Sequence, residues 1–382
     1  MRVLHFYKTS LPDSMGGTEQ VIDQIASGAK KLGVETDVLS LTPHLVPRTV
    51  ELNGYRVHRA KLDLQIASTG FSASAFLRFA QLAKKADVIH YHFPWPFMDL
   101  VHFATMVKKP TVVTYHSDII RQKHLLMVYR PLMWKFLGDV NRIVATSPNY
   151  LATSDVLAKY KHKVSVIPIG IDKATYPVPS PDKLTYWRDR LAPKFFLFVG
   201  VIRYYKGLHI LMEATQGTDY PIVIVGAGPI EKELKAQALQ LGLRNIHFLG
   251  RLPDEDKVAL LTLCFGVLFP SHLRSEAFGI SLLEGAMYGK PMISSEIGTG
   301  TTFINIADET GLVVPPSDPL AMRQAMRYLW EHPEQAAGMG RRAEAQYWKH
   351  FTGDQMVGEY MTLYRELAGL SPAASRERSA SG

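Results

Sequence analysis

The chain has 382 residues, too many for one hydrophobic core of ordinary size, and its length fits two domains of under about 200 residues each. Hydrophobic residues make up 47% of the chain and charged residues 20%, with one cysteine and no apolar run near the ~18 residues of a membrane span, so we expect a cytoplasmic protein without disulfides. The net charge of the chain is +8, made up of +10 in residues 1–190, with 25 basic and 15 acidic residues, and −2 in residues 191–382, with 18 and 20. The first half is expected to face nucleic acid, a lipid surface or a phosphorylated lipid, or else to be a solvated basic surface.

Apolar runs of strand length alternate with helical segments along the chain, which predicts parallel α/β sheets. In the first half we expect strands at 3–6, 36–41, 88–91, 111–114, 142–145 and 164–167, and a helix at 20–31. Residues 170–190, with prolines at 177, 179 and 181, are expected to form a linker. The second half predicts strands at 195–199, 222–225, 246–249, 267–269 and 292–294 and a helix at 355–367, before a disordered tail at 371–382.

This pattern predicts two Rossmann-like domains, residues 1–175 and 190–354, with a ligand in the cleft between them at the carboxyl ends of the strands. In the first half, Gly16 and Gly17 lie between the first strand and its helix, where backbone N–H groups could approach a phosphate or form an ordinary tight turn. His116 follows strand 111–114, so we expect it at the cleft.

Two cations follow the first strand of the second half. Arg203 and Lys206 are three residues apart after the run 195–199, and can converge on one anion. Arg offers a two-pronged fork and Lys a point charge, a combination that suits a diphosphate. The alternative is a solvated basic turn.

Two carboxylates, Glu276 and Glu284, lie eight residues apart across the start of a predicted helix. The backbone N–H groups of Phe278, Gly279 and Ile280 would form an anion-receptive helix N-terminus. Glu284 lies among apolar residues and needs a partner, for which we expect ribose hydroxyls rather than a structural ion pair.

We expect no metal site. Asp254 and Asp256 match a metal-binding Asp-x-Asp pattern, but they follow Pro253 and precede a helical run, so Asp254 is interpreted as a helix N-cap. His90 and His92 would share one face of a strand, but no third ligand is evident. One of the two facing the cleft as an acceptor contact is the preferred interpretation.

As a set, the Gly-Gly loop, Thr114-x-His-x-Asp118, Gly200-x-x-Arg-x-x-Lys-Gly207 and Glu276-x-Phe-Gly-x4-Glu284 resemble family 4 of the retaining glycosyltransferases. The likeness extends to about residue 370. It implies the GT-B fold, in which two Rossmann-like domains enclose a cleft and a C-terminal helix, here 355–370, packs back onto the first domain.

The resemblance also implies roles for individual residues. Gly17 would touch the donor phosphates and Arg203 and Lys206 would hold the diphosphate. Glu276 and His116 would contact the transferred sugar, Glu284 the ribose and the loop at Arg251 the base. No metal or other cofactor is implied, because the Arg and the Lys neutralise the leaving group.

A narrower likeness rests on residues 5–8, 91–99, 115–118 and 270–278, which resemble bacterial O-antigen mannosyltransferases. It implies transfer of mannose from GDP-mannose to an undecaprenyl-diphosphate-linked GlcNAc or mannosyl-GlcNAc, in α-1,3 linkage, by an enzyme peripheral to the inner membrane. The related D-rhamnan enzymes, which use GDP-D-rhamnose, are hard to separate by sequence pattern.

The basic first half would then meet a lipid diphosphate at an anionic membrane surface. The candidate segments are Lys108-Lys109 and 121–135, where Arg121, Lys123, Arg130 and Lys135 mix with apolar residues. A buried helix with cations at its rim is the alternative. A sugar-nucleotide epimerase and a non-catalytic binding protein are competing functions, whereas a slightly acidic second half argues against nucleic acid. The oligomeric state is left open.

Overall fold

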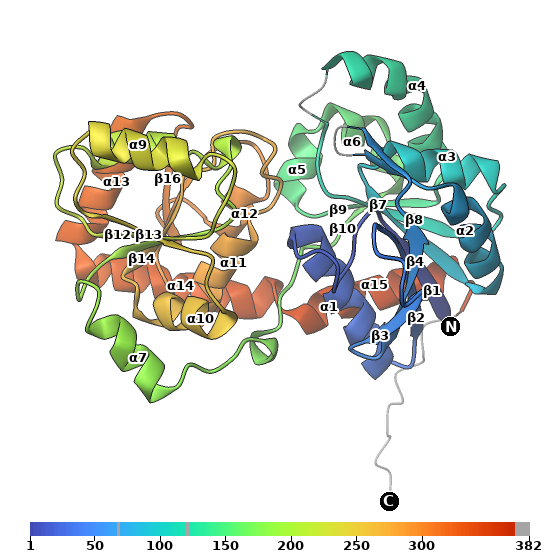
Figure 1. The fold of residues 1–382 in the computed structure, drawn as a ribbon, viewed down its shortest axis with the longest axis horizontal. Helices are drawn as coiled ribbons and strands as arrows, with labels where there is room; N and C mark the ends of the chain where they lie inside the picture. Colours follow the sequence, from blue (N-terminus) through green and yellow to red (C-terminus); the bar gives the residue numbers. More distant parts are fainter. Residues whose placement is uncertain (67–68, 120–122, 371–382) are drawn as a thin grey trace, which may run out of the picture.

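The computed structural model describes residues 1–66, 69–119 and 123–370, so the tail expected to be disordered and Arg121 lie outside the described residues. Figure 1 shows two α/β lobes side by side, each with its own sheet and its own helices. The alternating strands and helices thus fold into two Rossmann-like units, and the predicted α/β fold class is confirmed.

The first lobe contains an eight-stranded sheet in the order β10-β9-β8-β7-β1-β2-β4-β3. Neighbouring strands are parallel except for β3 and β4, which form an antiparallel hairpin at one edge, and a separate hairpin is formed by β5 and β6. The strands are β1 (Arg2–Phe6), β2 (Glu35–Thr42), β3 (Thr49–Leu52), β4 (Tyr55–Lys61), β5 (Leu64–Ile66), β6 (Thr69–Phe71), β7 (Val88–Phe93), β8 (Thr111–Tyr115), β9 (Arg142–Ala145) and β10 (Val164–Val166). The helices are α1 (Gly17–Lys31), α2 (Ala73–Lys85), α3 (Pro96–Ala104), α4 (Lys123–Asp139), α5 (Pro148–Thr153), α6 (Asp155–Lys159) and the 3-10 turn η1 (Lys161–Lys163).

The second lobe contains a six-stranded parallel sheet in the order β13-β12-β11-β14-β15-β16. Its strands are β11 (Phe196–Val199), β12 (Ile222–Val225), β13 (Ile246–Gly250), β14 (Gly266–Phe269), β15 (Met292–Ser295) and β16 (Gly311–Val314). Its helical elements are η3 (Tyr204–Lys206), α8 (Leu208–Thr215), α9 (Glu231–Gln240), α10 (Asp254–Leu263), α11 (Ile280–Met287), α12 (Thr301–Ile304), α13 (Pro319–Glu331) and α14 (Pro333–His350). Every residue of β11 and β12 is buried, because helices cover both faces of this parallel sheet and favour continuous apolar runs.

The chain passes between the lobes at two adjacent segments. The backbone N–H of Ile171 donates to Phe351, and that of Gly353 donates to Ile171. The second segment leads into α15 (Gly353–Leu367), which starts at a capping box between Thr352 and Gln355. This helix returns from the second lobe to pack on α1 (Figure 1).

The segment expected to be a linker contains ordered structure. It holds η2 (Lys173–Thr175) and α7 (Pro181–Arg188), and α7 packs on α10. Asp256 anchors it by accepting a 2.9 Å hydrogen bond from Trp187 Nε1 and forming a 2.9 Å ion pair with Lys183. The expectation that Asp254 caps α10 is wrong: Pro253 occupies the N-cap position, and Asp254 lies in the first turn, where it pairs with Lys257 at 3.2 Å.

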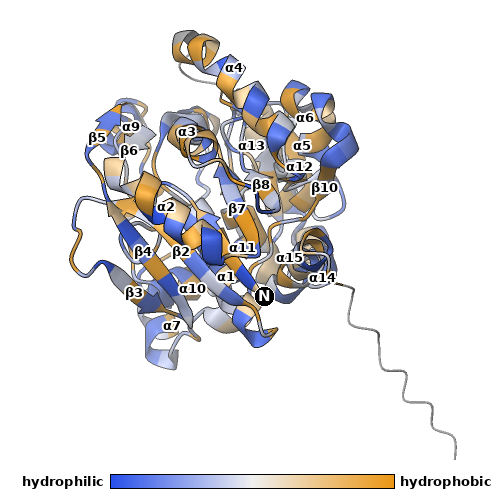
Figure 2. Cartoon of the chain, turned by 90° about the vertical axis from the view of Figure 1, so that its right-hand side faces the viewer, coloured by the Kyte–Doolittle hydropathy of each residue, from blue (hydrophilic) through white to orange (hydrophobic). Residues whose placement is uncertain are grey.

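Helix α4 divides into two parts. Its C-terminal half is buried through Met133, Phe136 and Leu137, whereas Leu125, Met127 and Val128 near its start are 54%, 67% and 80% exposed. Figure 2 shows α4 at the edge of the first lobe with hydrophobic and hydrophilic residues along it. Within the part of the chain that the structure describes, no helix combines the length and apolar character needed to cross a bilayer.

The contact between α1 and α15 generates a stability prediction. A Cβ added to Gly28 would lie 2.6 Å from Cγ2 of the buried Val357, whereas one added to Gly358 of α15 would meet nothing within 4 Å. Gly358→Ala should therefore raise the free energy of unfolding by roughly 0.5–1 kcal/mol, because alanine favours the helix. Gly28→Ala should lower it by about 1–3 kcal/mol through overpacking.

Urea denaturation of the two variants checks this prediction. The double variant Gly28→Ala/Val357→Ala should lose less unfolding free energy than Gly28→Ala and Val357→Ala lose in sum. The reason is that the alanine at 357 removes the clash with the alanine at 28. A Gly28→Ala protein as stable as Gly358→Ala would contradict the close packing of α15 on α1.

Candidate active site

A cavity of about 400 Å³ lies between the lobes where strands of both sheets end. The first lobe contributes the loop after β1 and the residues after β8, and the second contributes the loops after β11 and β14 with the start of α11. The sequence-predicted residues that line this cavity are Gly16, Gly17, His116, Lys206, Glu276, Phe278, Gly279, Ile280 and Glu284.

Two predicted residues do not line this cavity. Arg203 is exposed at the N-cap of η3, and Arg251 is exposed just after β13. The expected convergence of Arg203 and Lys206 on one point is therefore absent from this conformation. Lys206, in contrast, is buried at the cavity wall.

Lys206 and Glu276 form an ion pair in the cavity wall. Their side chains are 11% and 12% exposed, and Glu276 Oε2 receives both the Lys206 ammonium and a 3.2 Å hydrogen bond from Ser271. Such a pair is little screened by water, so its charges act strongly on any group that enters the cavity. The structure thus couples the two predicted motifs, which lie 70 residues apart in sequence, through their side chains.

The backbone holds this pair in place. Gly207 has φ +71°, and a Cβ there would lie 1.9 Å from the Pro270 carbonyl oxygen, so only glycine permits the loops to approach this closely. The His272 N–H also donates to the Tyr205 carbonyl at 3.0 Å. The loops that carry Lys206 and Glu276 are therefore fixed to each other without help from a ligand.

The N-terminus of α11 opens onto the same cavity. Ser281 Oγ donates a 2.7 Å hydrogen bond to the Val199 carbonyl and so ties the helix to the end of β11. A Cβ on Gly17 would lie 3.2 Å from Ile280 Cδ1, which shows how closely the first lobe approaches this helix end. The partial positive charge of the helix N-terminus adds to that of Lys206.

Glu284 has the structural partners that the sequence analysis set aside. Its Oε1 pairs with Lys257 at 2.9 Å and accepts a 3.0 Å hydrogen bond from Tyr176, while the residue is only 4% exposed. Desolvation and the nearby Glu284 carboxylate raise the pKa of Tyr176, so it stays a neutral donor. Both bonds engage Oε1, and Glu284 also lines the cavity.

His116 lines the cavity as expected, whereas His90 and His92 do not. Both are fully buried, so the expectation that one faces the cleft is wrong. His92 instead bonds His116 from behind, with 2.9 Å between His92 Nδ1 and His116 Nε2. Burial lowers the pKa of His116 to about 3, so it is neutral at pH 7.

Arg274 and Asp118 form an ion pair across the cleft, and neither was assigned a role from the sequence. Arg274 Nη2 donates to Asp118 Oδ2 at 3.2 Å, and its Nη1 donates to Thr153 at 3.0 Å and to the Gly298 carbonyl at 2.7 Å. The bridge joins the two lobes two residues from His116 on one side and two from Glu276 on the other. Each of the two residues lies two positions from a predicted site residue, and this proximity in sequence could have identified them.

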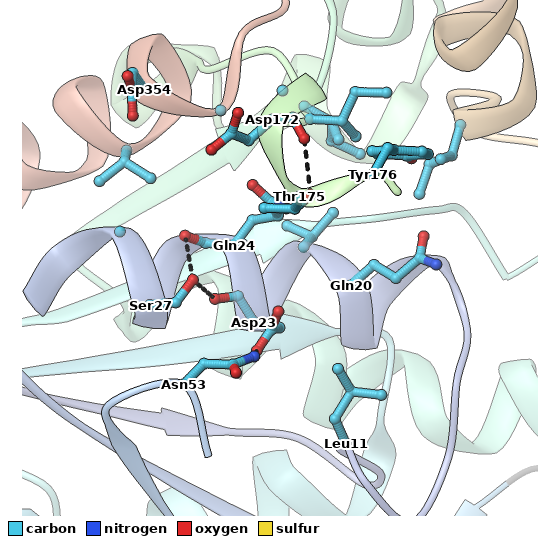
Figure 3. Close-up of a pocket in the computed structure, with 18 of the residues that line it drawn as sticks. Leu11, Gln20, Asp23, Gln24, Ser27, Asn53, Asp172, Thr175, Tyr176 and Asp354 are labelled. Atoms are coloured by element: carbon cyan, nitrogen blue, oxygen red, sulfur yellow. Dashed lines mark hydrogen bonds between the residues drawn. The ribbon is translucent and has the colours of Figure 1, made fainter. Parts of the chain in front are cut away.

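A second cavity, of about 500 Å³, adjoins the first on the side of the crossing segments and shares Lys257 and Ile280 with it. Figure 3 shows Gln20 and Gln24 of α1 on the side of the helix that faces the segment from Asp172 to Tyr176, while Asp23 points toward Asn53. Tyr176 also binds Glu284, so this space continues the cleft beyond that carboxylate.

Comparison with known proteins identifies related chains. Residues 15–175 match the family described as Glycosyltransferase Family 4, and residues 187–346 match Glycosyl transferases group 1. The chain is 66% identical to the D-rhamnosyltransferase WbpZ of Pseudomonas aeruginosa, over 92% of each chain. It is 48% identical to O-antigen chain mannosyltransferase C of Escherichia coli, over 96% of this chain and 99% of that protein. A sucrose-phosphate synthase from Thermosynechococcus elongatus shares the fold, with a TM-score of 0.80 at 19% identity over 96% of this chain and 99% of that one.

Proposed function

This chain belongs to the family 4 glycosyltransferases of the GT-B fold that act in O-antigen synthesis, and we propose that it transfers D-rhamnose from GDP-D-rhamnose to a lipid-diphosphate-linked acceptor. The observation that carries the proposal is the cavity in which Lys206, Glu276 and the N-terminus of α11 meet His116 from the opposite lobe. It offers positive charge for a diphosphate beside hydroxyl-binding groups for a sugar.

The donor diphosphate would lie against Lys206 and the backbone N–H groups at Phe278, Gly279 and Ile280. Gly16 and Gly17 would approach it from the first lobe, and Arg203 would turn inward when the donor binds. Oε2 of Glu284 would accept from a ribose hydroxyl, since Lys257 and Tyr176 both use Oε1. Arg251 would face the base.

Cleavage of the sugar–phosphate bond develops negative charge on the leaving diphosphate. Lys206 and the helix N-terminus are held in place before the reaction, so they stabilise this charge without reorganisation. They would take the part that a metal plays in other transferases, which supports a metal-independent reaction. Domain closure would complete the site.

The nearby carboxylates suit a retaining reaction without an enzymic nucleophile. Glu276 Oε2 is engaged by Lys206 and Ser271. Asp118 is engaged by Arg274 and accepts further hydrogen bonds from Tyr115 at 2.9 Å and Ser154 at 2.8 Å. A front-face displacement, in which the leaving phosphate helps to deprotonate the acceptor, fits these restraints.

Mannose from GDP-mannose is the second candidate donor. D-rhamnose is 6-deoxymannose, so the two donors differ in one hydroxyl group. The mannosyltransferase relative supports mannose at 48% identity, and the D-rhamnosyltransferase relative supports rhamnose at 66%. We place D-rhamnose first because the D-rhamnosyltransferase relative has the higher overall identity to this chain.

The acceptor would be a GlcNAc or mannosyl-GlcNAc on undecaprenyl diphosphate, joined in α-1,3 linkage, and presented at the cytoplasmic face of the inner membrane. Exposed apolar residues at the start of α4 lie near exposed basic ones, Arg130 and Lys135. Such a surface rests at lipid headgroups, with the apolar side chains in the interface and the cations on anionic lipid.

The donor is tested by incubating the enzyme with GDP-D-rhamnose, GDP-mannose or UDP-glucose and a synthetic lipid-diphosphate acceptor with one or two sugars. We expect a product heavier by one deoxyhexose, detected by mass spectrometry, with GDP-D-rhamnose preferred over GDP-mannose in direct competition. NMR of the product should show retention at the anomeric carbon. Preferred transfer from GDP-mannose would make mannose the first candidate and D-rhamnose the second. Transfer from UDP-glucose alone would contradict both candidate donors.

Membrane contact is tested by sedimentation with phosphatidylglycerol vesicles at low salt. Met127→Glu/Val128→Glu should reduce the bound fraction several-fold, because it places charge in the apolar tip of α4. Leu239→Glu is a matched control, since Leu239 is 83% exposed on α9 of the second lobe. If wild-type protein stays in the supernatant, or if both variants bind equally well, α4 is not the contact.

A further inference from the structure

Three histidine rings lie in a row from the middle of the first sheet to the cleft. His5 on β1 bonds His92 on β7, with 3.0 Å between His5 Nδ1 and His92 Nε2. His92 Nδ1 lies 2.9 Å from Nε2 of His116, which follows β8. Adjacent rings are nearly parallel, with interplanar angles of 18° and 21°. We call His5, His92 and His116 the histidine row.

The whole row is uncharged at neutral pH. His5 and His92 are fully buried, and burial lowers the pKa of His5 to about 3 and that of His92 well below its ordinary value. A neutral imidazole has one N–H donor and one acceptor nitrogen. The nitrogen that carries the proton in one ring therefore determines which nitrogen carries it in the next. The row as a whole has two self-consistent sets of tautomers.

The end of the row decides between these arrangements. Among the described residues, the buried Nε2 of His5 has no hydrogen-bond partner. A buried N–H without an acceptor is rarer than an acceptor without a donor. His5 is therefore expected to keep its proton on Nδ1 and donate to His92, which then donates from its own Nδ1 to Nε2 of His116.

From this geometry we propose that His5 and His92 are positioning residues that hold His116 as the Nδ1–H tautomer. His116 then presents an N–H donor, rather than an acceptor, to an oxygen of the bound donor substrate in the cleft. The proposal deepens the function proposed above and rests on it for the identity of that substrate. The tautomer itself is a property of the free protein.

His90 supports the row from the side without joining it. Its ring lies 4.6 Å from that of His5 and 4.3 Å from that of His92, measured between centroids. Its two nitrogens bond Tyr364 at 2.6 Å and Thr114 at 2.7 Å, and Thr114 in turn bonds Tyr360 at 2.7 Å. Tyr364 of α15 and Thr114 of β8 therefore satisfy both nitrogens of His90 and leave the row as a separate chain of bonds.

The three buried rings His5, His90 and His92 also have ligand atoms within 4.8 Å of one another, close enough to consider a metal ion. Both nitrogens of His90 are already bonded to hydroxyl groups, and a divalent ion there would have to displace one of these bonds. Hydrogen bonding accounts for every nitrogen of the cluster except Nε2 of His5. Metal binding is therefore an outcome of the test and not the proposal.

The direct test is long-range ¹⁵N–¹H correlation NMR of the free protein with labelled histidine, assigned with His5→Asn and His116→Gln variants. Protonated and unprotonated ring nitrogens have well-separated ¹⁵N shifts, so the spectrum reports each tautomer without any substrate. We expect Nδ1–H at His92 and His116. Nε2–H at His116, or a charged imidazolium in the row at pH 7, would overturn the proposal.

Kinetics then separate positioning from simple loss of stability. His5→Leu removes the donor to His92 and should lower kcat at least several-fold with little change in the KM for the nucleotide sugar. His5→Asn, whose amide N–H₂ can replace Nδ1–H, should restore most of the rate. His102→Leu is the matched control, because His102 is buried like His5 but lies outside the row. Its two nitrogens bond Tyr91 and Asp139.

Three other results would overturn either the positioning role or the proposed function. If His5→Leu and His102→Leu lower Tm equally and leave kcat equally intact, the row is structural only and the positioning role fails. Stoichiometric zinc in purified wild-type protein, lost in His5→Leu, would assign the cluster to a metal and also overturn the proposal. If wild-type protein transfers none of the tested sugars, the proposed function fails, while the NMR result still decides the tautomer.

Discussion

The ion pair between Lys206 and Glu276 is the interaction on which the rest of the cleft depends. Each residue follows a different strand of the second sheet, and each would be costly to bury alone. Pairing makes the burial tolerable, and the close approach of Gly207 to Pro270 fixes the geometry. The ammonium retains donors for an incoming phosphate. A site of this kind is assembled before substrate arrives, which is the condition for electrostatic catalysis.

The first lobe contributes His116 to the cavity, and the sheet behind this residue has an unusually polar interior. Imidazole rings replace aliphatic side chains between its central strands. Helix α15 returns from the second lobe, where Tyr364 bonds His90 and Tyr360 bonds Thr114, the other partner of His90. The same helix therefore joins the lobes and supports the strands behind His116. Arg274 and Asp118 bridge the lobes on the opposite side of the cleft. The residues that line the cavity therefore lie between two connections that join the lobes.

Sequence patterns predict the buried parallel strands well: the expected strand 222–225 coincides with β12, and 88–91 falls within β7. They missed β3 and β4, because Arg56 and His58 make β4 look polar, although both bond Asp37 on β2. The turn Asn53-Gly54, with positive φ at both residues, was the usable signal. The partners of Glu284 and the approach of His5 to His92 depend on helix packing and strand register. These are set by the tertiary fold and cannot be derived from spacing along one chain.

We infer that Lys206 and its surroundings form a diphosphate site, and calorimetric titration with GDP and GMP measures whether they do. One charged hydrogen-bonding contact contributes about 1.5–3 kcal/mol, so wild-type protein should bind GDP roughly 10- to 150-fold more tightly than GMP. Lys206→Ala should lose most of that preference, while Lys235→Ala, an exposed lysine on α9, should keep it. Equal affinity for GDP and GMP in the wild-type protein, or an unchanged preference in Lys206→Ala, would show that Lys206 does not hold the diphosphate.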